Sequence, residues 1–441
     1  MEKFAIVLTS TFPFGKSEDF FAAELPCLLR HFNRIVILTR SREGPQTRPI
    51  PDGVEVHRIS AVGFRGRLRY LRIPFLGEFW REIQNIRRGG QVKLTVKIVR
   101  NLISFIIHGL HMRGKLVQIL EEHGRLKNGE GVVLYAYWME FPAYAALRVK
   151  RAVPALKVIC RAHGCDLYWE RHSPAYLPLR KYIADHIDAA YFISEQGRDY
   201  FMRKNQIPND GRLKVARLGV KGRNVMARAS SDGVLRILSC SFVAAVKRLD
   251  LIAQALAQID GFEVEWTHIG DGNEMEELKG LASRLLDRRA NIRYSFKGYL
   301  RNEQVYDYYA GCSVDALVNV SSSEGVPVSM MEAFAFGVPV LATAVGGVPE
   351  LVSRANGFLL PADATAGDVA RAIGGMRGLP EAEIQALKAN AYDTWRKFCN
   401  ADVNYMKFAE EVLEIAAMEG KGAAFPGAGA RAERPPRGKG A

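Results

Sequence analysis

Two glutamates, Glu324 and Glu332, could do chemistry on a bound ligand. Glu332 is the only charged residue between Glu324 and Glu350, and it lies in a run apolar enough to be buried. A lone carboxylate seldom stays buried without a partner, because its desolvation is costly. Two carboxylates suit the acid and base of a glycosidase, and they also suit hydrogen bonding to ligand hydroxyl groups. The plainer interpretation is one solvated loop residue and one satisfied core residue.

The local pattern predicts the elements that position these glutamates. Residues 314–320 form an apolar run typical of a buried strand, and 338–343 form a second one. Between them we expect a helix over 327–336, because proline is favoured at the first helical position and Gly337 ends the run. The preceding turn then places Glu324 and several free backbone N–H groups at a helix N-terminus, which is a site for anions such as phosphate.

This stretch resembles the signature of glycosyltransferase family 4, a group of retaining, nucleotide-sugar-dependent enzymes. The family's hallmark is two glutamates separated by seven residues around Glu-Gly-hydrophobic-Pro, followed by Gly-x-Pro-Val. The residues that carry the resemblance here are Glu324, Gly325, Val326, Pro327, Glu332, Gly337, Pro339 and Val340, followed by Gly346, Gly347, Pro349 and Glu350. The resemblance implies an α/β protein with the GT-B fold, in which two Rossmann-like, doubly wound domains face a central cleft.

The 441 residues are enough for two or three domains. We expect an N-terminal acceptor domain over 1–220, with a basic insert at 62–120. A polar linker of small residues follows at 221–233, and a nucleotide-sugar donor domain is expected over 234–418. Residues 419–441, rich in Gly, Ala, Pro and Arg, are expected to be disordered.

The resemblance also implies roles for single residues of the donor domain. Glu332 would accept hydrogen bonds from the ribose hydroxyls, and Glu324 would contact the donor sugar. Lys247 falls on the family's lysine, which lies against the donor's diphosphate. The family's arginine position falls on Phe242, a departure that Arg248 could compensate. The expected donor-binding residues are Gly15, Lys247, Arg248, Glu324, Gly325, Val326, Pro327 and Glu332.

A glycine-bearing loop follows the first predicted strand, at residues 4–8, and leads into a helix over 18–31. A further strand is expected at 34–39. Ligands bind where such loops leave a parallel sheet. In the family this loop borders the donor's diphosphate, so the resemblance implies that Gly15 does so here.

His163 follows another predicted strand, at 157–161, within Arg-Ala-His-Gly-Cys-Asp-Leu-Tyr. This motif resembles a branch of the family typical of bacterial surface-glycan enzymes, in which the histidine lies near the reacting sugar. The simpler interpretation is that His163 and Asp166 hydrogen-bond across the loop. We predict His163, Lys247 and Glu324 as the catalytic residues.

The net charge of +14 is concentrated in the insert at 62–120, which holds twelve Lys and Arg residues against two acids. Basic residues beside apolar ones are typical of a helix lying on an anionic membrane. An ordinary solvated insert and nucleic-acid binding are the alternatives, and no nucleic-acid module is apparent. The residues predicted to contact the membrane or the acceptor are Arg65, Arg67, Arg69 and Arg72.

Composition limits the remaining possibilities. The six cysteines are scattered, which fits a reducing compartment, and the chain shows no signal-peptide core and no membrane span. We therefore expect a cytoplasmic protein associated with the inner face of the plasma membrane. No Asp-x-Asp triplet is present, so neither a metal nor another cofactor is predicted to be required.

Together these observations predict a retaining glycosyltransferase of the hexosyltransferase type. The expected donor is a UDP- or GDP-linked sugar, and the expected acceptor is a glycan or lipid-linked saccharide of a cell-surface polysaccharide or exopolysaccharide. A sugar-nucleotide epimerase of the same fold and a non-catalytic, nucleotide-sugar-binding subunit are the alternatives. The basic insert counts against the epimerase, while Phe242 favours the non-catalytic subunit.

Overall fold

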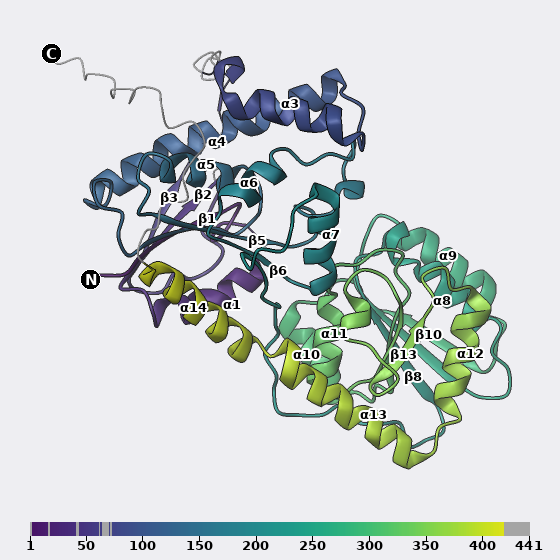
Figure 1. Cartoon of the computed structure of the whole chain (residues 1–441). Helices are drawn as coiled ribbons and strands as arrows, with labels where there is room; N and C mark the ends of the chain where they lie inside the picture. Colours follow the sequence, from purple (N-terminus) through teal and green to yellow (C-terminus); the bar gives the residue numbers. More distant parts are fainter. Residues whose placement is uncertain are drawn as a thin grey trace.

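The computed structural model describes residues 2–15, 18–40, 44–60, 62–63, 70 and 73–418. Within these residues the chain forms two α/β halves, each built around one parallel sheet (Figure 1). The predicted membrane-facing residues Arg65, Arg67, Arg69 and Arg72 lie outside the described residues, as does the tail at 419–441.

The described part of the N-terminal half has a sheet of seven strands in the order β3-β2-β1-β4-β5-β6-β7. Its strands are β1 (Phe4–Thr9), β2 (Arg34–Thr39), β3 (Val54–Arg58), β4 (Val132–Ala136), β5 (Lys157–Ala162), β6 (Ala189–Phe192) and β7 (Leu213–Val215). Its helices are α1 (Asp19–Leu29), α3 (Gly77–Gly89), α4 (Val96–Glu122), α5 (Phe141–Lys150), α6 (Arg180–His186) and α7 (Glu195–Asn205).

The C-terminal half has a sheet of six strands among its described residues, in the order β10-β9-β8-β11-β12-β13. Its strands are β8 (Leu235–Cys240), β9 (Val264–Ile269), β10 (Ile292–Phe296), β11 (Ala316–Asn319), β12 (Val340–Thr343) and β13 (Gly357–Leu360). Its helices are α8 (Leu249–Leu256), α9 (Met275–Leu286), α10 (Asn302–Gly311), α11 (Val328–Ala335), α12 (Ala366–Arg377) and α13 (Glu381–Thr394). The predicted pair of doubly wound α/β halves is confirmed.

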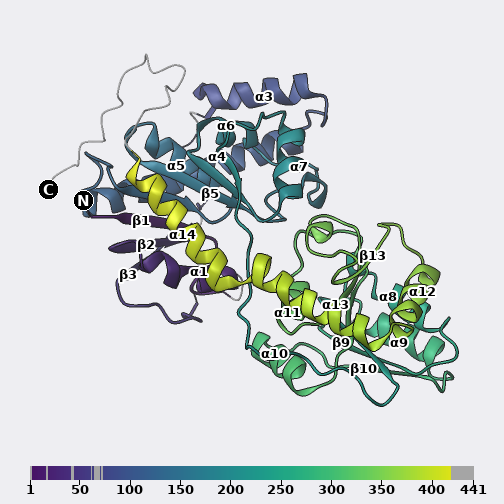
Figure 2. The same ribbon diagram turned by 60° about the horizontal axis from the view of Figure 1, so that its bottom comes forward.

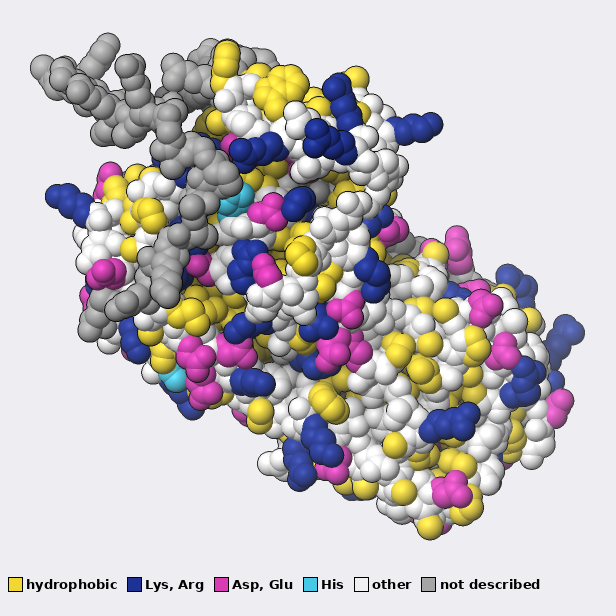
Figure 3. Space-filling model, in the orientation of Figure 1, with side chains coloured by type: hydrophobic (Ala, Val, Ile, Leu, Met, Phe, Trp, Pro, Cys, Tyr) yellow, Lys and Arg dark blue, Asp and Glu magenta, His cyan; other side chains and the backbone are white. Residues whose placement is uncertain are grey.

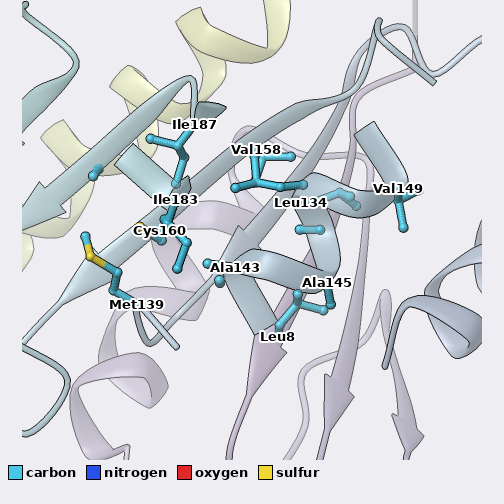
Figure 4. Packing of buried hydrophobic residues seen from close by; sticks show 14 of the residues in the cluster. Leu8, Leu134, Met139, Ala143, Ala145, Val149, Val158, Cys160, Ile183 and Ile187 are labelled. Atoms are coloured by element: carbon cyan, nitrogen blue, oxygen red, sulfur yellow. The ribbon is translucent and has the colours of Figure 1, made fainter. Parts of the chain in front are cut away.

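Helices cover both faces of each sheet, so the central strands are continuous apolar runs. The core between α5 and the N-terminal sheet shows this packing: Leu8, Leu134 and Val158 of the sheet meet Ala143 and Ala145 of α5 (Figure 4). The small side chains on α5 let the helix lie close to the strands.

The last helix, α14 (Ala401–Ala417), packs on the N-terminal half, although the predicted donor domain extended to residue 418 (Figures 1 and 2). Its apolar stripe, which includes Phe408 and Val412, joins the core beneath β1, β4 and β6. The chain crosses between the halves twice at one place, where Val220 N–H donates to Cys399 O at 2.8 Å and Ala401 N–H to Val220 O at 3.2 Å.

The insert contains α3 and α4, and the apolar stripe of α4 is part of the core. Leu102, Ile106 and Met112 are buried, and Gly109 lies so close to Tyr144 of α5 that a Cβ there would fall 2.4 Å from its ring. Among the described helices, none is both long and apolar enough to cross a membrane.

Replacing Phe408 by alanine tests the docking of α14. Its ring lies 4.9 Å from that of Tyr191, and the buried Arg161 guanidinium lies 4.2 Å from its centroid. We expect Phe408→Ala to lower the free energy of unfolding by about 3–5 kcal/mol in chemical denaturation, because the cavity cannot fully collapse. Val403→Ala on the same helix is the control, since Val403 is 54% exposed, and should change it by less than about 0.5 kcal/mol. Equal losses in the two variants would contradict the packing.

Candidate active site

The strand order of the C-terminal sheet reverses between β8 and β11, which are adjacent. Loops that leave neighbouring strands at such a switch point lie side by side and form the ligand site of open α/β sheets. Here the loops after β8 and β11 are in contact, because Ser322 N–H donates to Val246 O at 2.8 Å. The fold therefore brings Lys247 and Glu324 to one place.

Lys247 and Glu324 form an ion pair, with Nζ 2.7 Å from Oε1. The Glu324 side chain is 9% exposed and that of Lys247 is 22% exposed, so the pair is largely screened from water. Asn319, at the end of β11, donates a longer bond of 3.4 Å to the same Glu324 oxygen. The predicted catalytic lysine and glutamate thus neutralise each other.

The backbone around Glu324 is shaped by the loop after β12. Gly346 has a φ of +53°, and a Cβ at this position would lie 1.9 Å from Glu324 O, so only glycine fits. Gly347 N–H donates to Gly325 O at 2.8 Å. These contacts fix the turn at 324–327 in front of α11.

The turn leaves donors available at the N-terminus of α11. Pro327 is the residue just before the helix. Within the described residues, the backbone N–H groups of Gly325, Val326 and Val328 have no hydrogen-bond acceptor. Beside the Lys247 ammonium, these groups can bind an anion.

Glu332 lies one turn into α11 and is 5% exposed. Burial raises the pKa of this carboxyl from 4.5 to about 7, and a hydrogen bond from the Asn302 amide to Oε1 opposes the rise. The Cys240 thiol lies nearby, and burial together with Glu332 raises its pKa to about 12. Glu332 is therefore a buried acceptor at the edge of the anion site. Asn302 was not predicted, since it is one polar residue at the start of a helix.

Arg248 does not join this group. Its guanidinium donates to Ala364 O at 2.7 Å and to Ala362 O at 3.3 Å, on the segment after β13. The Phe242 side chain, where the family has an arginine, is 57% exposed.

Gly15 lies in the loop after β1, which is already filled by a carboxylate. Glu18 accepts hydrogen bonds from the backbone N–H groups of Ser10, Thr11 and Phe12 at 2.6–2.9 Å. A Cβ at Gly15 would lie 2.5 Å from Thr11 Cβ, so the glycine permits this tight turn. A contact between Gly15 and a donor stays a prediction.

Glu18 also connects the β1 loop to His163. Trp138, in the loop after β4, donates from Nε1 to Glu18 Oε1 at 2.7 Å, and its ring centroid lies 4.4 Å from that of His163. Strands β1 and β4 are neighbours at the switch point of the N-terminal sheet, so this arrangement mirrors the one in the other half. Neither Glu18 nor Trp138 was predicted, because their partnership spans the sequence.

His163 is buried, and its Nδ1 lies 3.8 Å from Asp166 Oδ2, which is too long for a hydrogen bond. The Asp166 carboxylate instead accepts from the backbone N–H groups of His163 and Met139 at 2.7 and 2.9 Å. Although burial opposes ionisation, contacts with His163 hold the pKa of Asp166 below its usual value. Asp166 therefore fixes the turn that presents His163.

The two halves meet at Glu350, the last residue of the signature. Its carboxylate accepts from the backbone N–H groups of Gln196 at 2.7 Å and Glu195 at 3.1 Å, and pairs with Arg217 at 2.8 Å. A carboxylate is favourable there because it faces the N-terminus of α7. The half that holds Glu324 is thereby attached to the half that holds His163.

One group among the described residues has the geometry to hold a metal ion: Glu55, His57 and His123, on β3 and after α4. Arg34 Nη1 lies 3.1 Å from His123 Nδ1 and must be the donor, because a guanidinium cannot accept. Nε2 of neutral His123 then carries the proton and faces Glu55 Oε2 at 3.3 Å. Glu55 also contacts His57 Nε2 at 2.5 Å, so its carboxylate faces both imidazoles.

The chain resembles known glycosyltransferases in sequence. Residues 235–376 match the family model described as "Glycosyl transferases group 1". The amylovoran biosynthesis glycosyltransferase AmsK of Erwinia amylovora is 28% identical over 159 residues, which is 34% of this chain but only 38% of that protein. The O-antigen biosynthesis glycosyltransferase WbnH of Escherichia coli is 25% identical over 261 residues, 58% of this chain and 71% of that protein.

The fold is shared with solved structures. Anabaena Alr3699/HepE, solved in complex with UDP-glucose, superposes with a TM-score of 0.61 at 15% identity, covering 93% of this chain and 99% of that one. The GT-B fold and the resemblance to the group 1 glycosyltransferases, both expected from the sequence, are confirmed.

The burial of Glu332 predicts a pH-dependent stability. Because the folded state raises the pKa of this carboxyl from 4.5 to about 7, it holds the proton more tightly than the unfolded state does. The resulting stability is fully present below pH 4.5 and is lost as the pH rises through 7. Glu332→Gln keeps an acceptor for Asn302 and carries no charge, so at pH 8 it should unfold with a free energy roughly 2–3 kcal/mol above wild type.

At pH 4.5 or below the two proteins should differ little, and both are compared by chemical denaturation at the two pH values. Glu383→Gln, at an exposed position at the start of α13, is the matched control and should show no such difference. If Glu332→Gln is stabilised equally at both pH values, the pKa of Glu332 is not raised in the folded state.

Proposed function

We propose that this chain, which carries a group 1 glycosyltransferase domain, is a retaining hexosyltransferase that uses a nucleotide-sugar donor. The acceptor would be a glycan or a lipid-linked saccharide in the assembly of a bacterial surface polysaccharide. The donor would be UDP- or GDP-linked. The observation that carries the proposal is the Lys247–Glu324 ion pair in front of the N-terminus of α11, with Glu332 buried on the same helix.

The reaction breaks the bond between the anomeric carbon and the diphosphate oxygen, and the electron pair stays on the diphosphate. The acceptor oxygen forms the new bond to the anomeric carbon, and its proton passes to an oxygen of the departing diphosphate. Fixed cations and backbone donors aimed at the leaving oxygen lower the barrier. Lys247 and the free N–H groups of Gly325, Val326 and Val328 would do this work, which requires no metal.

The two glutamates fit donor binding better than a glycosidase pair. Glu324 is paired with Lys247, and Glu332 with Asn302, so neither is poised to activate a water molecule. When the diphosphate replaces Glu324 as the partner of Lys247, the Glu324 carboxylate becomes available to the sugar hydroxyls. Glu332 would accept from the ribose hydroxyls, and His163 would lie beside the reacting sugar from the other half.

A peripheral membrane contact through the insert belongs to the same proposal. Phe75 and Trp80, just before and in the first turn of α3, are 86% and 52% exposed, and the same helix carries Arg81 and, in its last turn, Arg87 and Arg88. Figure 3 shows exposed hydrophobic side chains next to Lys and Arg over this part of the molecule. Aromatic side chains flanked by cations suit the interface of an anionic leaflet. At this membrane surface the protein would bind a lipid-linked acceptor, on the cytoplasmic side where nucleotide sugars are made.

Donor hydrolysis in the absence of acceptor tests the proposal. We expect the purified protein to hydrolyse one member of a panel of UDP-, GDP- and ADP-linked sugars slowly. Lys247→Ala should lower kcat by about 100-fold, the typical effect of losing one donor to a developing anion. Glu332→Ala should chiefly weaken nucleotide binding, because the ribose contact exists before and during the reaction.

The matched control is Lys279→Ala, which removes a half-exposed lysine of the same domain that pairs with Glu276 on α9. It should hydrolyse the donor at the wild-type rate. Unchanged hydrolysis in Lys247→Ala would contradict the assigned role. Failure of the wild type to bind or hydrolyse any nucleotide sugar would contradict the proposed function and favour a non-catalytic subunit.

A further inference from the structure

A nucleotide-sugar diphosphate carries two negative charges, but the donor half offers few free cations near Glu324. Lys247 is present, whereas both guanidinium contacts of Arg248 go to carbonyl oxygens after β13. Phe242 in the same loop is apolar and exposed. A second cation aimed at the diphosphate would have to come from elsewhere in the molecule.

Arg171 of the N-terminal half reaches this place. It ends the short helix η3 (Trp169–Arg171), and its Nη2 donates to Ser323 Oγ at 3.3 Å across the boundary between the halves. Ser323 immediately precedes Glu324. The guanidinium therefore lies beside the loop that carries the Lys247–Glu324 pair.

The other side of the Arg171 guanidinium contacts the loop that carries His163. A Cβ at Gly164 would lie 2.7 Å from Arg171 Nη1, so glycine makes room for it, and the Tyr168 ring lies 5.0 Å from Cζ. Arg171 is exposed, and among the described residues it forms no ion pair with a carboxylate. Its charge is therefore open to a ligand at the point where the loops of His163 and Glu324 face each other.

We propose that Arg171 binds the donor's diphosphate from the acceptor half. This inference rests on the proposed function and adds to it a residue that no motif marks. When the bond from the anomeric carbon to the diphosphate breaks, the guanidinium stabilises the charge that builds on the leaving oxygens and stays protonated throughout. Because Arg171 belongs to the half that holds the acceptor, leaving-group stabilisation is complete only when the two halves are together.

The alternative is that Arg171 merely links the halves through Ser323. Two variants separate these roles. Arg171→Ala removes the charge, whereas Ser323→Ala removes the link and leaves the guanidinium in place. If Arg171 binds the diphosphate, its bond to Ser323 is replaced on donor binding and can be lost at little cost.

The experiment measures donor hydrolysis by the full chain, with the nucleotide sugar that the wild type turns over. Arg171→Ala should lower kcat/KM by about 100-fold, and Arg171→Lys should fall between it and wild type. Arg171→Ala should also weaken binding of the nucleoside diphosphate about tenfold while leaving the nucleoside monophosphate unchanged, because only the former has the second phosphate. Ser323→Ala and Arg198→Ala, a control on α7 of the same half that pairs with Asp199, should behave as wild type.

The unfolding midpoint of each variant is recorded, so that a folding defect is not mistaken for a lost contact. Wild-type hydrolysis in Arg171→Ala, or an equal loss in Ser323→Ala, would overturn the inference. If Lys247→Ala loses hydrolysis in that case, the proposed function stands without Arg171. If the wild type neither binds nor hydrolyses any nucleotide sugar, the proposed function fails and the inference fails with it.

Discussion

The adjacency of β8 and β11 is the constraint on which the rest of the site depends. Because the strand order reverses between them, the loops that carry Lys247 and Glu324 leave the same edge of the sheet and meet as an ion pair. The N-terminal half repeats the arrangement at β1 and β4, where Glu18 and Trp138 meet beside His163. The contact of Glu350 with the start of α7 brings these two edges together. The candidate site therefore lies between two switch points and is built from both halves.

The part of the site that the sequence could predict is the part set by local structure. The strand, turn and helix around Glu332 follow from apolar runs bounded by Pro327 and Gly337, and strand β2 has the predicted ends at residues 34 and 39. Partnerships between distant residues could not be predicted, such as that of Glu18 with Trp138, which lies 120 positions away. The same is true of α14. Its apolar stripe marks an amphipathic helix, but nothing in that stripe tells which sheet it covers.

One feature of the site opposes stability and is consistent with a binding role. An uncharged side chain at position 332 could pack in the core without desolvating a charge. Glu332 does carry that cost, because its ionised form is desolvated. Residues that weaken the folded state are typical of functional sites, where a ligand supplies the missing partners. In contrast, the carboxylates of Glu18 and Asp166 already accept hydrogen bonds from backbone N–H groups of the protein. They build the site without being available to a ligand.

The number of protons released on binding tests whether Glu332 receives the ribose of a nucleotide sugar. It is measured by titration calorimetry at pH 6.5 in buffers of different ionisation enthalpy, with the nucleotide sugar that the protein accepts. Because a pKa of about 7 leaves most of Glu332 protonated at this pH in the free protein, and the ribose hydroxyls need the carboxylate, we expect proton release. This release should fade above pH 8 and be absent in Glu332→Gln. Proton uptake, or the same release in Glu332→Gln, would show that Glu332 does not receive the ribose.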